Sequence, residues 1–212
     1  MHLVLTDILT CPRCGPRFGL VLLAEEVRDR RVLEGWLGCS NCRERYRVHN
    51  GFADLRPPPA PPLDAPALPR ERGEDQAAIR LAALMGMGTG AGRGFSLVVG
   101  PAARHASAIA ALVEEAEVVG IDAGLAAWPE EAGVSRMAAT GLPFFDRTLR
   151  GVALSGDAAA ALLEEGARVL NPMGRLVVEG APADAEARIR GAGLRVLAQE
   201  GGTVVAGWAA RG

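Results

Sequence analysis

Four cysteines near the N-terminus carry the strongest chemical signal in this chain. Cys11 and Cys14 enclose Pro-Arg, Cys39 and Cys42 enclose Ser-Asn, and 24 residues separate the two pairs. A C-x-x-C turn places two sulfurs on one side of the chain, so two such turns can converge on one tetrahedral Zn²⁺. The spacing therefore predicts a structural zinc site made of the two C-x-x-C turns, with a hairpin between them. We call residues 11–14 the first hook and residues 39–42 the second hook.

Two disulfides or a redox-active cysteine pair are the alternatives. The cysteine-bearing segment is too short to be stable through core burial alone, and a bound metal would supply the missing folding free energy, so we favour zinc. Catalytic zinc keeps an open position for water, whereas four thiolates close the site. His49 follows Cys42 by seven residues, and we interpret it as a surface residue rather than a ligand.

Arginines alternate after the second hook, at Arg43, Arg45 and Arg47. On a strand they would share one face with His49. That face is either an RNA-contacting stripe that binds phosphates or a solvated strand surface. The acidic residues of the same segment favour the solvated surface, and both interpretations stay open.

The composition narrows the class of protein. All 23 basic residues are arginines, and 25 acidic residues leave a formal net charge of −2, so bulk charge gives no reason to expect a nucleic-acid partner. Hydrophobic residues make up 49% of the chain, enough to fill a real core. No apolar stretch is long enough for a membrane helix and the N-terminus lacks the basic start of a signal peptide, so we expect a cytoplasmic protein without membrane contact.

The elements that must position the cysteines fall into three segments. Residues 1–56 are expected to form a small β-rich zinc ribbon, residues 57–73 a proline-rich linker, and residues 74–212 a second domain. Proline fixes φ and lacks a backbone donor, which predicts an extended, semi-rigid linker. In the second domain short apolar strands alternate with helices, which predicts an α/β fold with a parallel sheet covered on both faces.

Hydrophobic periodicity gives the expected elements of the second domain. The expected strands cover residues 95–99, 117–121, 134–139, 151–154, 175–179, 194–200 and 203–209. The expected helices cover residues 74–87, 103–116, 157–170 and 183–192. Asp157 is the expected N-cap of the third helix, the glycine-rich run 88–94 an entry loop, and Gly201-Gly202 the turn of an antiparallel hairpin.

Residues 3–57 resemble a small zinc-ribbon family whose members are activator subunits of methyltransferases for tRNA, rRNA and translation factors. The stretches LTDILTCPRC and LGCSNCRERYRVHNGFADLRP carry the resemblance. The matching positions after the second hook are Tyr46, Val48, Gly51, Asp54 and Leu55. Arg47 and Ala53 stand where that family usually has proline. The resemblance implies a zinc-stabilised module that holds a methyltransferase.

Residues 75–210 resemble the class I S-adenosylmethionine-dependent methyltransferases. EVVGIDAG (117–124), GLPFF (141–145) and EEGARVLNPMGRLVVEG (164–180) carry this resemblance. It implies a Rossmann-like, mostly parallel seven-stranded sheet with a reversed last strand. It also implies cofactor contacts at Gly100, in the turn after the first strand, and at Asp122, whose carboxylate would bind the ribose.

The motifs that bind the cofactor in that family are largely replaced here. The first turn reads LVVGPAARHA, in which Gly100 is followed by Pro101 and two alanines instead of further glycines. Ala138 stands at the position of the acid that binds adenine, and Leu149-Arg150 at a Phe-Asp pair. No catalytic set of Ser, His and Asp converges in the sequence, so the catalytic residues are unknown. We interpret His105 as a surface or capping residue and the Glu164-Glu165 pair as solvated surface residues.

Two functions follow from these patterns. The first is a catalytically inactive, methyltransferase-like protein that acts as a scaffold or regulatory module for a protein or ribonucleoprotein partner. The alternative is an active S-adenosylmethionine-dependent methyltransferase acting on RNA or protein, since a ribbon fused to such a domain also resembles the rRNA guanine methyltransferases. The replaced cofactor turn favours the first, and makes binding of S-adenosylmethionine doubtful.

Overall fold

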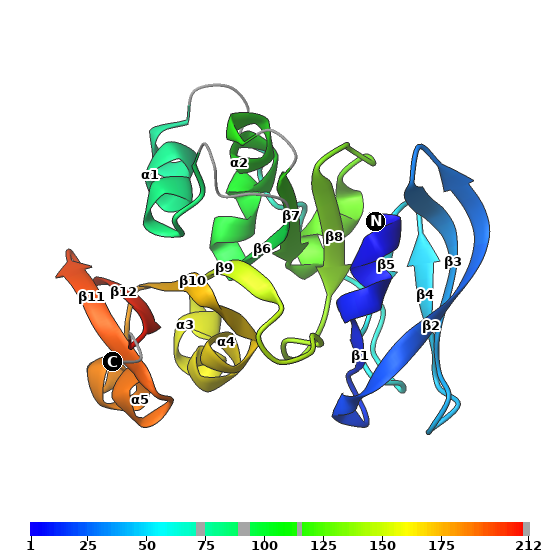
Figure 1. Ribbon diagram of the computed structural model, residues 1–212. Coiled ribbons are helices and arrows are strands. Elements are labelled where there is room, and N and C mark those ends of the chain that lie inside the picture. The colour runs from blue at the N-terminus through cyan, green and yellow to red at the C-terminus, as the bar shows by residue number, and fades with distance from the viewer. Residues whose placement is uncertain (71–74, 89–93, 114–115, 210–212) are drawn as a thin grey trace.

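The computed structural model describes residues 1–70, 75–88, 94–113 and 116–209. In this part of the chain the strands form one 12-stranded sheet in the order β1-β2-β3-β4-β5-β8-β7-β6-β9-β10-β12-β11. The strands of the cysteine-bearing segment lie at one end of the molecule and the C-terminal strands at the other (Figure 1). None of the helices in these residues combines the length and apolar character that crossing a membrane requires.

The N-terminal segment is almost entirely β-structure. A 3-10 helix, η1 (Leu3–Ile8), leads into it. The strands that follow are β1 (Thr10–Cys11), β2 (Gly15–Arg28), β3 (Arg31–Cys39), β4 (Arg45–His49) and β5 (Phe52–Asp54). Each strand pairs antiparallel with the next. This β-rich arrangement agrees with the fold expected for residues 1–56.

The second segment continues the same sheet. Its strands are β6 (Gly94–Val99), β7 (Ala116–Ile121), β8 (Val134–Ala138), β9 (Leu149–Leu154), β10 (Leu170–Glu179), β11 (Leu194–Glu200) and β12 (Thr203–Trp208). Strands β8, β7, β6, β9 and β10 are parallel neighbours, and β12 runs antiparallel to both β10 and β11. The predicted strands and the closing hairpin are thereby confirmed, except that β10 begins at Leu170, five residues before the predicted start.

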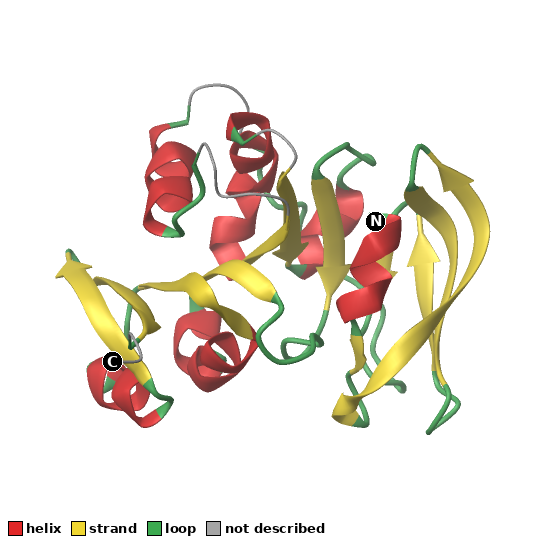
Figure 2. Cartoon of the chain, viewed as in Figure 1, coloured by secondary structure: helices red, strands yellow, loops and turns green. Residues whose placement is uncertain are grey.

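Helices cover both faces of these strands, as Figure 2 shows. They are α1 (Gln76–Leu84), η2 (Gly100–His105), α2 (Ala106–Leu112), η3 (Ala123–Ala127), α3 (Asp157–Ala161), α4 (Leu163–Val169) and α5 (Ala185–Gly191). Because side chains alternate along a strand, Leu97 and Val99 join a core with α4 and α5, whereas Val98 joins a second core with α1 and α2.

Several predicted helix boundaries were wrong. The helices expected over 103–116 and 157–170 each break into two pieces, η2 with α2 and α3 with α4. The predicted N-cap Asp157 is the first residue of α3, and Gly156 is the N-cap, at a φ of 59° that favours glycine. The entry loop expected over 88–94 lies mostly outside the described residues, as does the predicted start of α1 at residue 74.

The residues expected on the surface form specific contacts. His105 is only 4% exposed, and its Nδ1 lies 2.5 Å from Oδ2 of Asp75, the N-cap of α1. Of the two expected roles, surface residue or cap, the first was wrong, because tertiary packing brings the cap of α1 onto η2; His105 does occupy the N-cap position of α2, although its side chain forms no cap hydrogen bond. Glu164 is exposed as expected, but it forms an ion pair with Arg188 at 2.6 Å. Glu165, which is half-buried, accepts a backbone hydrogen bond at 2.7 Å.

The linker is docked along the chain that follows β7. Its residues are mostly exposed, but Leu63 and Leu68 pack against the second core. The backbone amide of Leu68 donates to the carbonyl oxygen of Gly124 at 3.1 Å, and Trp128 Nε1 donates to the carbonyl oxygen of Leu68 at 2.8 Å. Arg70 lies 5.6 Å from the centre of the Trp128 ring. Residues 71–73 of the predicted linker lie outside the described residues.

Parallel pairing of β5 with β8 joins the two segments into one sheet. Phe52 lies opposite Arg136, Asp54 lies opposite Ala138, and the Leu55 amide donates to the Ala138 carbonyl oxygen at 2.8 Å. The resemblance to methyltransferases implies a sheet of seven strands. The observed sheet is wider because the ribbon supplies further strands along the edge of β8.

A buried ion network stabilises this joint. The Arg136 side chain is fully buried, and its Nη2 donates to the Asn50 carbonyl oxygen at 2.5 Å and to Glu130 at 3.2 Å. Its Nη1 donates to the Leu125 carbonyl oxygen at 3.2 Å. Arg31 of β3 also binds Glu130, at 2.6 Å. Arg136 therefore links the ribbon and η3 to Glu130, and Glu130 in turn binds Arg31 of the ribbon.

We predict that Arg136→Leu destabilises the whole chain by about 3 to 5 kcal/mol, because it removes one of the cationic partners of the partly buried Glu130 and leaves the Asn50 and Leu125 carbonyl oxygens without this donor. Urea denaturation followed by circular dichroism measures the change. Arg45→Leu, on an exposed position of β4, is the matched control and should change the free energy of unfolding by less than about 0.5 kcal/mol. Equal unfolding midpoints for the two variants would contradict the role given to Arg136.

Candidate metal centre

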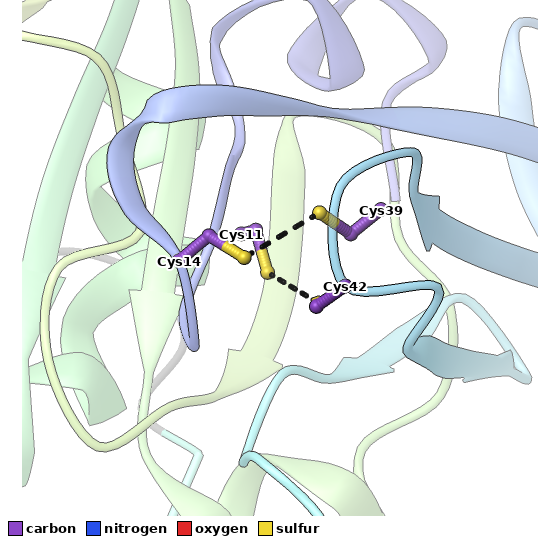
Figure 3. Close-up of side chains that lie close together, drawn as sticks. All are labelled: Cys11, Cys14, Cys39 and Cys42. Carbon is purple, nitrogen blue, oxygen red and sulfur yellow. Dashed lines mark hydrogen bonds between the residues drawn. The ribbon is translucent and has the colours of Figure 1, made fainter.

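The two cysteine hooks lie at the same end of two neighbouring hairpins (Figure 3). Cys11 ends β1 and Cys14 lies in the turn into β2. Cys39 ends β3 and Cys42 lies in the turn before β4. All four Sγ atoms lie within 4.8 Å of one another. Folding therefore brings the two predicted pairs together at one point.

The distances fit a closed zinc site. Cys11 Sγ lies 3.7 Å from Cys42 Sγ, and Cys14 Sγ lies 3.9 Å from Cys39 Sγ. A tetrahedron with metal–sulfur bonds of about 2.3 Å has sulfurs about 3.8 Å apart, whereas a disulfide needs about 2.05 Å. All four thiols are free. The geometry therefore agrees with four ligands for one Zn²⁺ and not with two disulfides.

Hydrogen-bond donors around the first hook favour its thiolate form. The Tyr46 hydroxyl lies 3.5 Å from Cys11 Sγ, and Asn41 Nδ2 donates to Cys14 Sγ at 3.2 Å. Burial raises the pKa of Cys11, but hydrogen bonds from Tyr46 and from backbone amides outweigh this effect and lower the pKa to about 7. Such outer donors orient metal ligands and tune their affinity.

Cys42 shows the opposite tendency. The backbone amide of Glu44 lowers the pKa of Cys42, but loss of solvation and the three neighbouring thiols outweigh it and raise the pKa to about 12. Four thiolates within this small space would repel one another, so the Cys42 thiol keeps its proton when no cation is bound. A divalent cation removes that repulsion, which is the electrostatic reason to expect a metal here.

The loop over residues 141–145 holds the first hook in place. The Thr10 amide donates to the Pro143 carbonyl oxygen at 2.9 Å, and the Phe145 amide donates to the Ile8 carbonyl oxygen at 3.0 Å. The Phe145 ring also packs over Gly19, where a Cβ would lie 3.3 Å from it. Sequence patterns did not indicate that this loop supports the metal centre, because it lies far along the chain from both hooks.

The predicted arginine stripe is only partly formed. Arg45, Arg47 and His49 share the outer face of β4, but Arg43 precedes the strand and has a φ of 64°. Glu34 binds Arg47 at 2.8 Å and His49 at 3.0 Å, so part of the positive charge is already neutralised. The His49 side chain is 68% exposed, as expected for a surface residue.

Gly100 and Asp122, the two candidate cofactor contacts, follow the carboxyl ends of the neighbouring strands β6 and β7. Gly100 has a φ of 74°, and a Cβ there would lie 2.5 Å from the Ser155 carbonyl oxygen. The Asp122 carboxylate accepts a hydrogen bond from the Gly124 amide at 2.7 Å and caps η3. Both residues therefore already have structural roles: Gly100 packs against the backbone at Ser155, and Asp122 caps η3.

Comparisons with known proteins add no family assignment. No model of a protein family and no curated protein matches this chain. The metal centre and the sheet are therefore interpreted from the residues and their geometry.

We predict about one zinc per chain, bound by Cys11, Cys14, Cys39 and Cys42. Cys39→Ser should reduce the zinc content well below one and lower the melting temperature, because metal binding contributes folding free energy. Ser40→Ala, in the same hook, is the control and should keep full zinc content. Elemental analysis of chains purified without chelators checks this, and a metal-free wild type would contradict it.

We predict that zinc affinity falls as the pH falls. Metal ligands must be deprotonated, and the Cys11 thiolate, whose pKa is lowered from 9.0 to about 7, is lost as the pH falls through that range. Competition with a chromogenic chelator from pH 9 to pH 6 measures the trend. Tyr46→Phe removes a donor to Cys11 and should move the profile to higher pH, while an unchanged profile would contradict the assigned hydrogen bond.

Proposed function

We propose that this chain is a zinc-stabilised, methyltransferase-like protein without catalytic activity. In this proposal it acts as a scaffold or regulatory module for a protein or ribonucleoprotein partner. One observation carries the proposal: the turn that would have to hold S-adenosylmethionine is packed tightly against the neighbouring turn of the same chain.

The order and direction of the last seven strands support the methyltransferase-like part. β6 lies between β7 and β9, five strands are parallel, and the antiparallel β12 lies between β10 and β11. The resemblance of residues 75–210 to class I methyltransferases implies this reversed last strand. A fold alone does not imply activity, which would require an open carboxyl edge, where α/β sheets of this kind bind ligands.

The carboxyl edge between β6 and β9 is filled by the chain. Ser155, which follows β9, accepts a hydrogen bond from the Ala102 amide at 2.8 Å and donates to the Val99 carbonyl oxygen at 2.8 Å. Pro101 lies against Gly156, where a Cβ would be 2.9 Å from the proline ring. A cofactor that needs close approach to this backbone would have to separate the two turns.

The neighbouring edge, after β7, is also covered. A Cβ on Gly124 would lie 2.6 Å from the Pro66 carbonyl oxygen and 2.8 Å from the Leu68 amide, so the linker lies directly on this backbone. Gly124 is two residues from Asp122, whose carboxylate is occupied as a cap. The family's ribose contact would therefore compete with both the cap and the linker.

The ribbon supports a role in binding. Its resemblance is to subunits that hold methyltransferases, and here β5 pairs directly with β8 of the methyltransferase-like segment. In the alternative proposal, an active methyltransferase on RNA or protein, Asp122 is the retained contact that favours activity. That proposal requires the linker and the turn after β6 to move when cofactor binds.

We predict that S-adenosylmethionine binds with a dissociation constant weaker than about 1 mM, because several polar anchors are missing, each contributing roughly 1 to 3 kcal/mol. Isothermal titration calorimetry of the zinc-loaded chain measures this constant. Asp122→Ala should cost about 1 kcal/mol of stability through loss of the η3 cap. A low-micromolar constant that Asp122→Ala abolishes would instead establish the enzyme.

A further inference from the structure

Arginines that are scattered along the sequence meet on the C-terminal strands. Arg175 of β10 and Arg195 of β11 both lie opposite Gly207 of β12, one on each side. Residues opposite one another in a ladder point to the same face, so Arg175 and Arg195 extend from one face on either side of Gly207, and the Leu197 side chain lies over Gly207. Arg147, from the loop before β9, lies over the ring of Trp208, 4.9 Å from its centre.

These residues line one cavity of about 510 Å³, which we call the arginine groove. It is defined by Arg147, Arg175, Arg195, Gly207 and Trp208. No carboxylate is among its lining residues in the described part of the chain. The groove is therefore a concentrated positive site in a protein whose formal net charge is −2.

The arginines of the groove have no acidic partner among the described residues. Within those residues none of the three side chains forms an ion pair or a hydrogen bond, whereas neighbouring Arg168 binds Asp146 at 2.9 Å. Like charges held together without counter-charges repel one another and raise the local potential. An anionic ligand would relieve this repulsion.

Apolar surface continues the groove. Met173 is 93% exposed and Leu197 is 44% exposed, and both line the same cavity. The Trp208 ring is held in position because its Nε1 donates to the Leu170 carbonyl oxygen at 3.0 Å. The site thus combines charge with a fixed aromatic ring and flanking apolar side chains.

We propose that the arginine groove binds single-stranded RNA. Arg175 and Arg195 would bind backbone phosphates, since guanidinium groups match phosphate geometry with two parallel hydrogen bonds. A base would stack on the exposed guanidinium plane of Arg147, which itself lies over the Trp208 ring, because RNA-binding proteins stack unpaired bases on guanidinium planes as well as on aromatic rings. This inference rests on the proposed function as a binding module and names the chemistry of its partner.

RNA fits this groove better than an acidic peptide does. A peptide offers carboxylates to the arginines but no planar base for the Arg147–Trp208 pair. The ribbon gathers its arginines less well, because Glu34 binds Arg47 and His49, and Arg43 precedes β4 instead of sharing its outer face with Arg45. A cavity of this size also lies within the range of about 300 to 1,000 Å³ that accommodates small ligands such as a nucleotide.

Fluorescence anisotropy with a labelled 12-nucleotide oligouridylate tests the proposal on the full zinc-loaded chain. We expect Arg147→Ala/Arg175→Ala/Arg195→Ala to bind at least about tenfold more weakly than wild type. The slope of log affinity against log salt should become shallower by about 0.7 for each phosphate that no longer has an arginine partner. Arg147→Lys keeps the charge but not the plane, so it should lower affinity and leave the slope nearly unchanged.

The matched control removes the same charge from the ribbon. Arg17→Ala/Arg43→Ala/Arg45→Ala should bind the oligouridylate within about twofold of wild type. Every substituted arginine in the two triple variants is exposed, so circular dichroism and zinc content should show folded chains.

Three results would overturn the proposal. These are no binding by wild type, equal reductions of affinity in the two triple variants, or preference for a 12-residue polyglutamate over RNA at the same arginines. The last result would assign the groove to an acidic protein. None of the three depends on S-adenosylmethionine, so the calorimetric test of the inactive-methyltransferase proposal is independent of this one.

Discussion

Parallel pairing of β5 with β8 holds the two halves of the molecule in one sheet, and the buried ion network lies at this joint. A segment as short as the ribbon buries too little apolar surface to stand alone. By adding its last strand to the sheet, the ribbon places Cys11, Cys39 and Tyr46 in the same core as the central strands. The register also buries Arg136 at the joint, where its charge must be balanced by Glu130 and by carbonyl groups of both segments.

The metal centre is coupled to the second segment through this arrangement. One hook is held by the carbonyl oxygen of Pro143, and the residues behind both hooks pack into the shared core. Metal binding at the four cysteines would therefore stabilise more than the ribbon. In the same way, a substitution in the 141–145 loop would change the position of the first hook without altering any cysteine.

The two edges of the parallel strands differ in character. At the carboxyl edge, Ser155 and the linker form hydrogen bonds with the backbone, and together with Pro101 they cover it. The arginine groove lies toward the opposite edge, where β11 begins and β12 ends. A covered carboxyl edge, together with arginines that have no acidic partner in the described part of the chain, is consistent with a fold used for binding.

Features whose information is local could be predicted from the residues alone. The spacing within each hook predicted the metal centre, and hydrophobic periodicity predicted the strands. Both signals depend on residues only a few positions apart in the chain. Long-range packing was needed to show that β5 joins β8, that His105 is buried against Asp75, and that the linker lies on Gly124. The arginine groove belongs to this second group. Its residues come from different strands and loops. Their charges lie close together only because β12 pairs between β10 and β11 in the folded sheet.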